Sequence, residues 1–136
     1  MDPLVTAAAT ALVSSMATDA WQQVRATAVA LWQRALPESS TAVDAELAQV
    51  REEVVAARDG DDQQAEADLA QEWGLRLARL LRQAPELAEE LGRLLDDEWL
   101  PLLGAADRER AAGIRMTAHA SGQARIYQAG RDQHIT

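Results

Sequence analysis

Apolar residues recur at three- and four-residue intervals through the first hundred positions, which is the spacing of one face of an α-helix. Each of four successive segments carries its own stripe of this kind. We expect the first helix from about Pro3 to Leu36, the second from Ser40 or Thr41, the third after the turn Asp59-Gly60-Asp61, and the fourth from Pro85. Trp21, Trp32, Trp73 and Trp99 lie on these stripes, where core packing is the ordinary role.

Proline and glycine mark the ends of these segments. Pro37 breaks the first helix, Gly60 closes the second with Asp61 expected to cap the third, and Pro101 and Gly104 end or kink the fourth. Short connections between amphipathic helices favour an antiparallel up-down arrangement. The sequence therefore predicts an all-α, four-helix antiparallel bundle over residues 1–104.

The pattern changes after Gly104. Residues 105–113 are polar and either extend a helix or act as a linker. From Ile114 the apolar residues alternate with polar ones, the two-residue period of a β-strand, with interruptions at Gly122 and Gly130. An isolated pair of strands is marginal in water. We expect residues 114–136 to be a β-prone tail, disordered or loosely docked in the resting monomer.

Charge and composition narrow the class of protein. The net charge is −9, which argues against nucleic acid as a partner because phosphate binding needs a cationic face. Residues 1–104 hold 19 acids and 8 arginines, whereas residues 105–136 hold 3 acids and 5 arginines. No cysteine, secretory signal or spanning segment is recognisable, so we expect a cytoplasmic protein at rest.

The sequence offers little for catalysis. His119 and His134 lie in the tail without a carboxylate cluster at ligand spacing, and solvated histidines are the ordinary reading. Paired acids such as Glu52-Glu53 are adjacent and diverge by about 100° on a helix, so they make poor acid/base pairs. We expect no enzyme activity, no metal and no cofactor.

The start of the first helix is unusually free of charge. From Pro3 to Val24 the only charged residue is Asp19. One interpretation is the most buried helix of the bundle. The other is a segment that leaves the bundle and enters a membrane, although about 15 helical residues span only ~22 Å of a ~30 Å hydrocarbon core. The membrane-active residues would then be Leu4, Val5, Leu12, Val13 and Met16.

The tail carries the strongest pattern. Gln128 lies between apolar positions and is followed by Gly130, which allows a bend. When identical strands stack in register, glutamine side chains form hydrogen-bonded ladders and apolar side chains close a dry interface. A frayed terminus and a single strand added to a partner's sheet remain as alternatives. The residues expected to form the cross-β unit are Gly122, Ala124, Ile126, Tyr127, Gln128, Ala129, Gly130, Gln133 and Ile135.

This tail resembles the bacterial amyloid signalling sequences, specifically the class similar to the animal RIP homotypic interaction motif (RHIM). The core of that motif is aliphatic-Gln-aliphatic-Gly, matched here by Tyr127 to Gly130, with Gln133 in its amide position and Ile135 in its apolar position. Tyr127 and Ala129 depart from the β-branched residues usual in the animal core, which bears on assembly with animal motifs but not on self-assembly.

An N-terminal helical domain ending in such a motif is similar to the Bell-domain effectors of bacteria. The resemblance implies a programmed-cell-death effector with three partners: further copies of itself in a fibril, an NLR-like nucleotide-binding receptor that carries a matching motif, and the inner (plasma) membrane after activation. The receptor's motifs would template the tail, and the helical domain would then act on the membrane. The alternative is a non-lytic adaptor or scaffold that assembles through residues 114–136 but only recruits a further protein.

Overall fold

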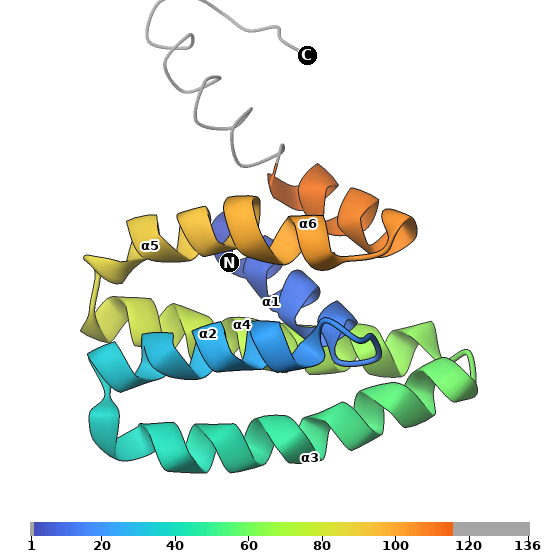
Figure 1. The fold of residues 1–136 in the computed structure, drawn as a ribbon, viewed down its shortest axis with the longest axis horizontal. Helices are drawn as coiled ribbons and strands as arrows, with labels where there is room; N and C mark the ends of the chain where they lie inside the picture. The colour runs from blue at the N-terminus through green and yellow to red at the C-terminus, as the bar shows by residue number, and fades with distance from the viewer. Residues whose placement is uncertain (1, 116–136) are drawn as a thin grey trace, which may run out of the picture.

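A computed structural model describes residues 2–115, and every element within that range is helical (Figure 1). The all-α prediction is confirmed for this part of the chain. The elements are α1 (Pro3–Ser15), α2 (Trp21–Ala35), the 3₁₀ turn η1 (Pro37–Ser39), α3 (Ser40–Asp59), α4 (Gln63–Gln83), α5 (Leu87–Arg93), the π-helical turn η2 (Leu94–Trp99) and α6 (Leu100–Leu102).

The prediction of one continuous helix from about Pro3 to Leu36 is wrong, because this segment forms two helices. α1 ends at Ser15 and α2 begins at Trp21. Between them the Thr18 hydroxyl donates to the Ser15 carbonyl at 2.8 Å and accepts from the Ala20 amide at 3.2 Å. A short polar side chain thus takes up backbone groups that a continuous helix would use, which is how serine and threonine compete with helical hydrogen bonding.

α1 is the central helix of the fold. It contacts α2, α3, α4, α5 and η2, and its most extensive contact is with α4. From α2 to α5 each long helix reverses the direction of the one before it, and α1 passes among them (Figure 1). All four tryptophans are buried, as predicted, and Trp32 meets Trp73 edge to face at 6.0 Å between ring centroids. The core is therefore assembled around α1.

The turn between α3 and α4 is capped by a different residue from the one predicted. Asp62, not Asp61, is the N-cap of α4, and its carboxylate accepts a hydrogen bond from the Ala65 amide at 3.0 Å. Asp61 has a φ of 54° and makes the turn itself. The left-handed position that often follows a helix is thus taken by Asp61 and not by Gly60. Aspartate tolerates this region better than most residues.

Residues 105–115 form a helix, so the helical alternative for residues 105–113 holds. We call residues 105–115 the C-terminal helix. Ile114 and Arg115, expected to begin a strand, are its last described turn. Ala111 is fully buried and Ile114 packs against the core, which ties this helix to the rest of the fold. No helix among residues 2–115 combines the length and apolar character needed to cross a bilayer.

Candidate functional site

The candidate membrane-active residues lie on α1 or, for Met16, at its C-cap, and the structure brings most of them into the core. Val5, Leu12, Val13 and Met16 are at most 2% exposed. Leu4 is half-buried at the edge of the same cluster. The interpretation of α1 as the most buried helix is thus what the folded chain shows. Nine of its thirteen residues are buried, including alanines that let α4 approach closely.

This burial sets the energy needed to free α1. Burying one such side chain contributes about 1.5–3 kcal/mol, so four contribute on the order of 6–12 kcal/mol as an upper bound. That is comparable with the ~5–15 kcal/mol total stability of an ordinary domain. α1 therefore cannot leave by a local fluctuation alone. Its release requires a compensating source of free energy, such as assembly or a membrane surface.

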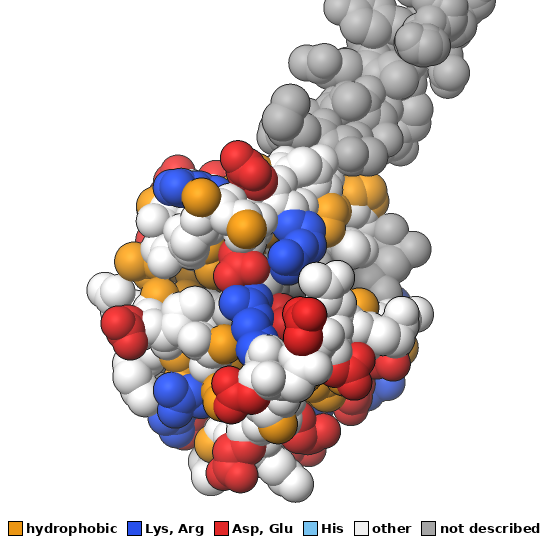
Figure 2. All heavy atoms as spheres, turned by 90° about the vertical axis from the view of Figure 1, so that its right-hand side faces the viewer, with side chains coloured by type: hydrophobic (Ala, Val, Ile, Leu, Met, Phe, Trp, Pro, Cys, Tyr) orange, Lys and Arg blue, Asp and Glu red, His pale blue; other side chains and the backbone are white. Residues whose placement is uncertain are grey.

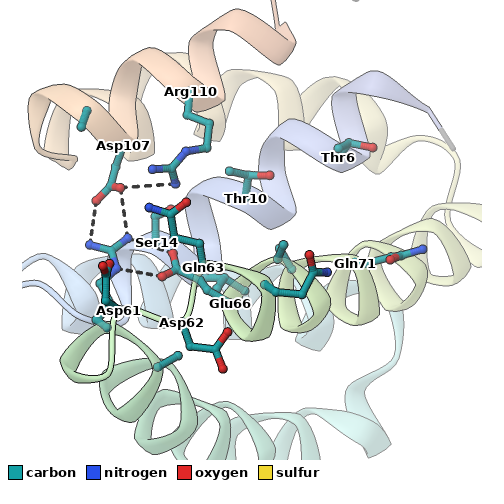
Figure 3. Close-up of a pocket in the computed structure, with 17 residues that line it drawn as sticks. Thr6, Thr10, Ser14, Asp61, Asp62, Gln63, Glu66, Gln71, Asp107 and Arg110 are labelled. Carbon is teal, nitrogen blue, oxygen red and sulfur yellow. Dashed lines mark hydrogen bonds and ion pairs between the residues drawn. The ribbon is translucent and has the colours of Figure 1, made fainter.

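One face of α1 carries hydroxyl groups that the sequence reasoning missed. Thr6, Thr10 and Ser14 follow at four-residue spacing and point towards a cavity of about 910 Å³ (Figure 3). The cavity lies between α1, α4, the α3–α4 turn and the C-terminal helix. Ser14 is 1% exposed, and its Oγ has no hydrogen-bond partner within the described chain. The regular threonine and serine spacing in the uncharged run is the signal that could have revealed this hydroxyl face.

Arg58 joins three elements at one end of the cavity. It donates to both carboxylate oxygens of Glu66 at 2.9 Å, and to both of Asp107 at 3.0 and 3.1 Å (Figure 3). Its own helix is α3, Glu66 is on α4, and Asp107 is on the C-terminal helix. The hydrogen bonds that Arg58 donates to Glu66, and then those that it donates to Asp107, raise the pKa of Arg58 above its ordinary value. Asp107 is 8% exposed, so its carboxylate is shielded from water, whereas the Arg58 side chain is 31% exposed.

A second ion pair holds the far end of the C-terminal helix. Arg115 donates to both carboxylate oxygens of Asp96 in η2, at 3.1 and 3.0 Å. Gly92 makes room for this contact. A Cβ added there would lie 3.2 Å from Arg115 Nη2 and 3.9 Å from Leu4 Cδ1. Arg115, the last described residue, thus lies next to Gly92, which also borders Leu4 at the start of α1.

Acidic side chains dominate the face of the domain that carries the α3–α4 turn. Figure 2 shows them around a short line of basic side chains.

Within residues 2–115 no group of three or more histidine or acidic residues is arranged to hold a metal ion. The predicted cross-β residues, from Gly122 to Ile135, lie outside the described residues.

Comparison with known proteins identifies no relative: no family model, curated protein or solved structure matches this chain.

Proposed function

We propose that this chain is a programmed-cell-death effector switched on by amyloid templating. A receptor with a matching motif seeds a cross-β stack, the tail of each chain adds to the stack, and the clustered helical domains act on the inner membrane. At rest the protein is cytoplasmic. Its helical domain is an antiparallel bundle in which α1 and α2 take the place of the expected first helix. The glutamine and glycine pattern from Tyr127 to Gln133 supports the templating step.

One structural observation supports the coupling between the two ends of the chain. Arg115, the last described residue of the C-terminal helix, and Leu4 of α1 both lie next to Gly92, and the chain continues from Arg115 towards the predicted cross-β residues. An event in the tail therefore acts directly on the element that borders α1. Stacking also concentrates the domains, which favours any membrane step that needs several copies.

The length of α1 limits how it can act on a bilayer. Thirteen residues make a helix of about 20 Å, shorter than the ~30 Å hydrocarbon core. Its apolar face suits insertion at the interface, with the hydroxyl face of Thr6, Thr10 and Ser14 towards water. Clustering many such helices thins or perforates a membrane where one helix does not.

The experiment is seeded assembly of the full chain, followed by vesicle leakage. Preformed fibres of the wild-type chain are added to monomer, and thioflavin binding and fibre diffraction report cross-β structure. The matched control carries Gln128→Pro and Gly130→Pro, which remove ladder hydrogen bonding in the tail and leave residues 2–115 unchanged. We expect seeded fibres and leakage of anionic vesicles from the wild type only. Wild-type chain that stays monomeric at high concentration with seeds would refute the proposal.

The burial of α1 also favours a second candidate, a non-lytic adaptor that assembles through its tail and recruits another protein by its helical surface. A helix that is mostly core needs no membrane role to explain its apolar sequence. Fibres that form as expected but leave vesicles intact would favour the adaptor over the effector.

A further inference from the structure

The C-terminal helix is attached to the domain by few contacts. Of its eleven residues only Asp107 and Ala111 are buried. Among the described residues, ion pairs join it to the rest of the domain at both ends, Arg58–Asp107 at one and Arg115–Asp96 at the other. Every longer helix of the domain buries more apolar side chains than this one. Compared with the longer helices, it is therefore the least firmly held.

The tether between the domain and the tail motif is short. Six residues, 116–121, separate Arg115 from Gly122, the first residue of the predicted cross-β unit. Fully extended, that connection reaches about 25 Å at ~3.5 Å per residue. If the C-terminal helix detaches and unfolds, the extended tether runs from residue 105 to residue 121 and reaches about 60 Å.

A cross-β stack advances far less per chain than the width of the domain. Each in-register chain adds about 4.7–4.8 Å along the fibril. A folded unit of this size has a radius of gyration of about 13 Å and hence a width of about 35 Å. About seven chains therefore stack within the height of one domain. In a parallel stack all the tethers leave from the same edge of the fibril, so the domains compete for the space beside it. A tether of about 25 Å keeps the domains too close to the fibril for all of them to fit. A tether of about 60 Å lets them spread out and relieves the crowding.

We propose that the C-terminal helix is a latch opened by this crowding: stacking of the tail pulls the Arg115–Asp96 and Arg58–Asp107 pairs apart, and the detached helix uncovers α1. This inference rests on the proposed function, since it requires the tail to stack. Detachment removes Asp107 and Arg110 from one wall of the cavity that Thr10 and Ser14 line. It also removes Arg115 from its place at Gly92, which Leu4 borders as well. The hydroxyl face and the first turn of α1 then meet water or lipid.

The decisive variant lengthens the tether without touching the folded domain. About ten glycine and serine residues inserted between Arg115 and Met116 add flexible reach. The matched control adds the same residues after Thr136, beyond the motif, where they leave the tether unchanged. Amide hydrogen exchange of residues 3–15 and 105–115 is measured in the monomer and in seeded fibres of each full-length chain.

In wild-type and control fibres we expect exchange of residues 105–115, and then of α1, to be at least about ten-fold faster than in the monomer. The chain with the inserted tether should form fibres and keep the monomer's protection. Fibres of the wild type that protect residues 105–115 as well as the monomer does would overturn the latch alone. The same holds if the longer tether loses protection equally. A wild type that forms no cross-β fibres overturns the proposed function, and the latch with it.

The ion pair nearest the tail can be tested in the monomer itself. Arg115→Asp places two carboxylates together, and Asp96→Arg in the same chain restores an opposite pair. We expect the single variant to raise exchange of residues 105–115 several-fold and the double variant to recover most of that change. Arg93→Gln is the matched control, because Arg93 is exposed on α5 and pairs with Glu90 instead. A single variant that exchanges like the wild type would show that Arg115 does not hold the latch.

Discussion

Arg51 of α3 donates a hydrogen bond from Nε to the main-chain carbonyl oxygen of Met16, over an N–O distance of 3.0 Å. Met16 is the C-cap of α1, where the last carbonyls of a helix have no partner within the helix. The guanidinium also places positive charge at the negative end of the α1 dipole. Arg51 thus holds the C-terminal end of α1, whereas Arg115 of the latch lies near its N-terminal end.

Replacing Arg51 with alanine is expected to lower the free energy of unfolding by about 1 kcal/mol. Hydrogen bonds with one charged partner contribute ~1.5–3 kcal/mol, and the exposure of Arg51 to water places this one below that range. Urea denaturation of the full chain measures the change. Arg79→Ala, at an exposed position of α4, is the control and should change stability by less than about 0.5 kcal/mol. Equal losses in the two variants would contradict a specific role for Arg51.

Leu12→Ala is expected to destabilise the fold by about 3 kcal/mol, because Leu12 is fully buried and its truncation leaves a cavity in the core. Leu75→Ala is the control, since Leu75 is 55% exposed on α4 and should cost less than about 0.5 kcal/mol. Thermal and urea unfolding measure both. A Leu12 variant as stable as the Leu75 variant would show that α1 is not a central core element.

This prediction affects how membrane experiments are read. Variants at Val5, Leu12, Val13 or Met16 alter the stability of the resting domain as well as any membrane contact, because all four are core residues. Leu4, which is half-buried at the edge, is the better position for a leakage assay. Leu4→Asn should reduce leakage with a smaller loss of stability than Leu12→Asn. Equal leakage from the Leu4 variant and the wild type would remove the first turn of α1 from the membrane contact.

The two aspartates of the α3–α4 turn are expected to respond in opposite directions. Asp62→Ala removes the N-cap of α4 and should cost about 1 kcal/mol. Asp61→Gly should be neutral or stabilising by up to about 1 kcal/mol, because glycine adopts the positive φ of 54° without the strain of a side chain. Denaturant midpoints compare the two variants with the wild type. A larger loss from Asp61→Gly than from Asp62→Ala would reverse the assignment of the cap.

Local patterns in the sequence predicted the helices and their buried faces. The stripes that contain Trp21, Trp73 and Trp99 are core faces, and the turn at Gly60 separates α3 from α4. These features depend on neighbours three or four positions away, which a sequence displays directly. The break after Ser15 was missed because the apolar spacing continues across it. The Thr18 hydroxyl bonds backbone groups at this break, a competition that the apolar spacing does not show.

The contacts that form the candidate site were beyond local patterns. Arg58 and Asp107 are 49 positions apart, and Arg115 and Asp96 are 19 apart. Arginine and acidic residues are common throughout this chain, so no spacing identifies which of them meet. Their pairing depends on how the C-terminal helix folds back on the domain. The prediction of a strand from Ile114 is wrong at Ile114 and Arg115, which are helical. The alternation of apolar and polar residues does not show that the preceding helix continues through them.

Trp99 in η2 donates an indole hydrogen bond to Thr27 Oγ1 of α2 at 2.8 Å, and a double-mutant cycle can measure this contact. Thr27→Val keeps the volume but leaves a buried N–H unpaired, so we expect a loss of about 1–3 kcal/mol in the free energy of unfolding. In a Trp99→Phe background the same change should cost less, because no N–H remains to be left unpaired. The resulting coupling is expected to be about 1 kcal/mol. Thr41→Val, at an exposed position of α3, serves as the control and should cost the same in both backgrounds. A coupling below about 0.3 kcal/mol would mean that packing alone, and not this hydrogen bond, joins η2 to α2.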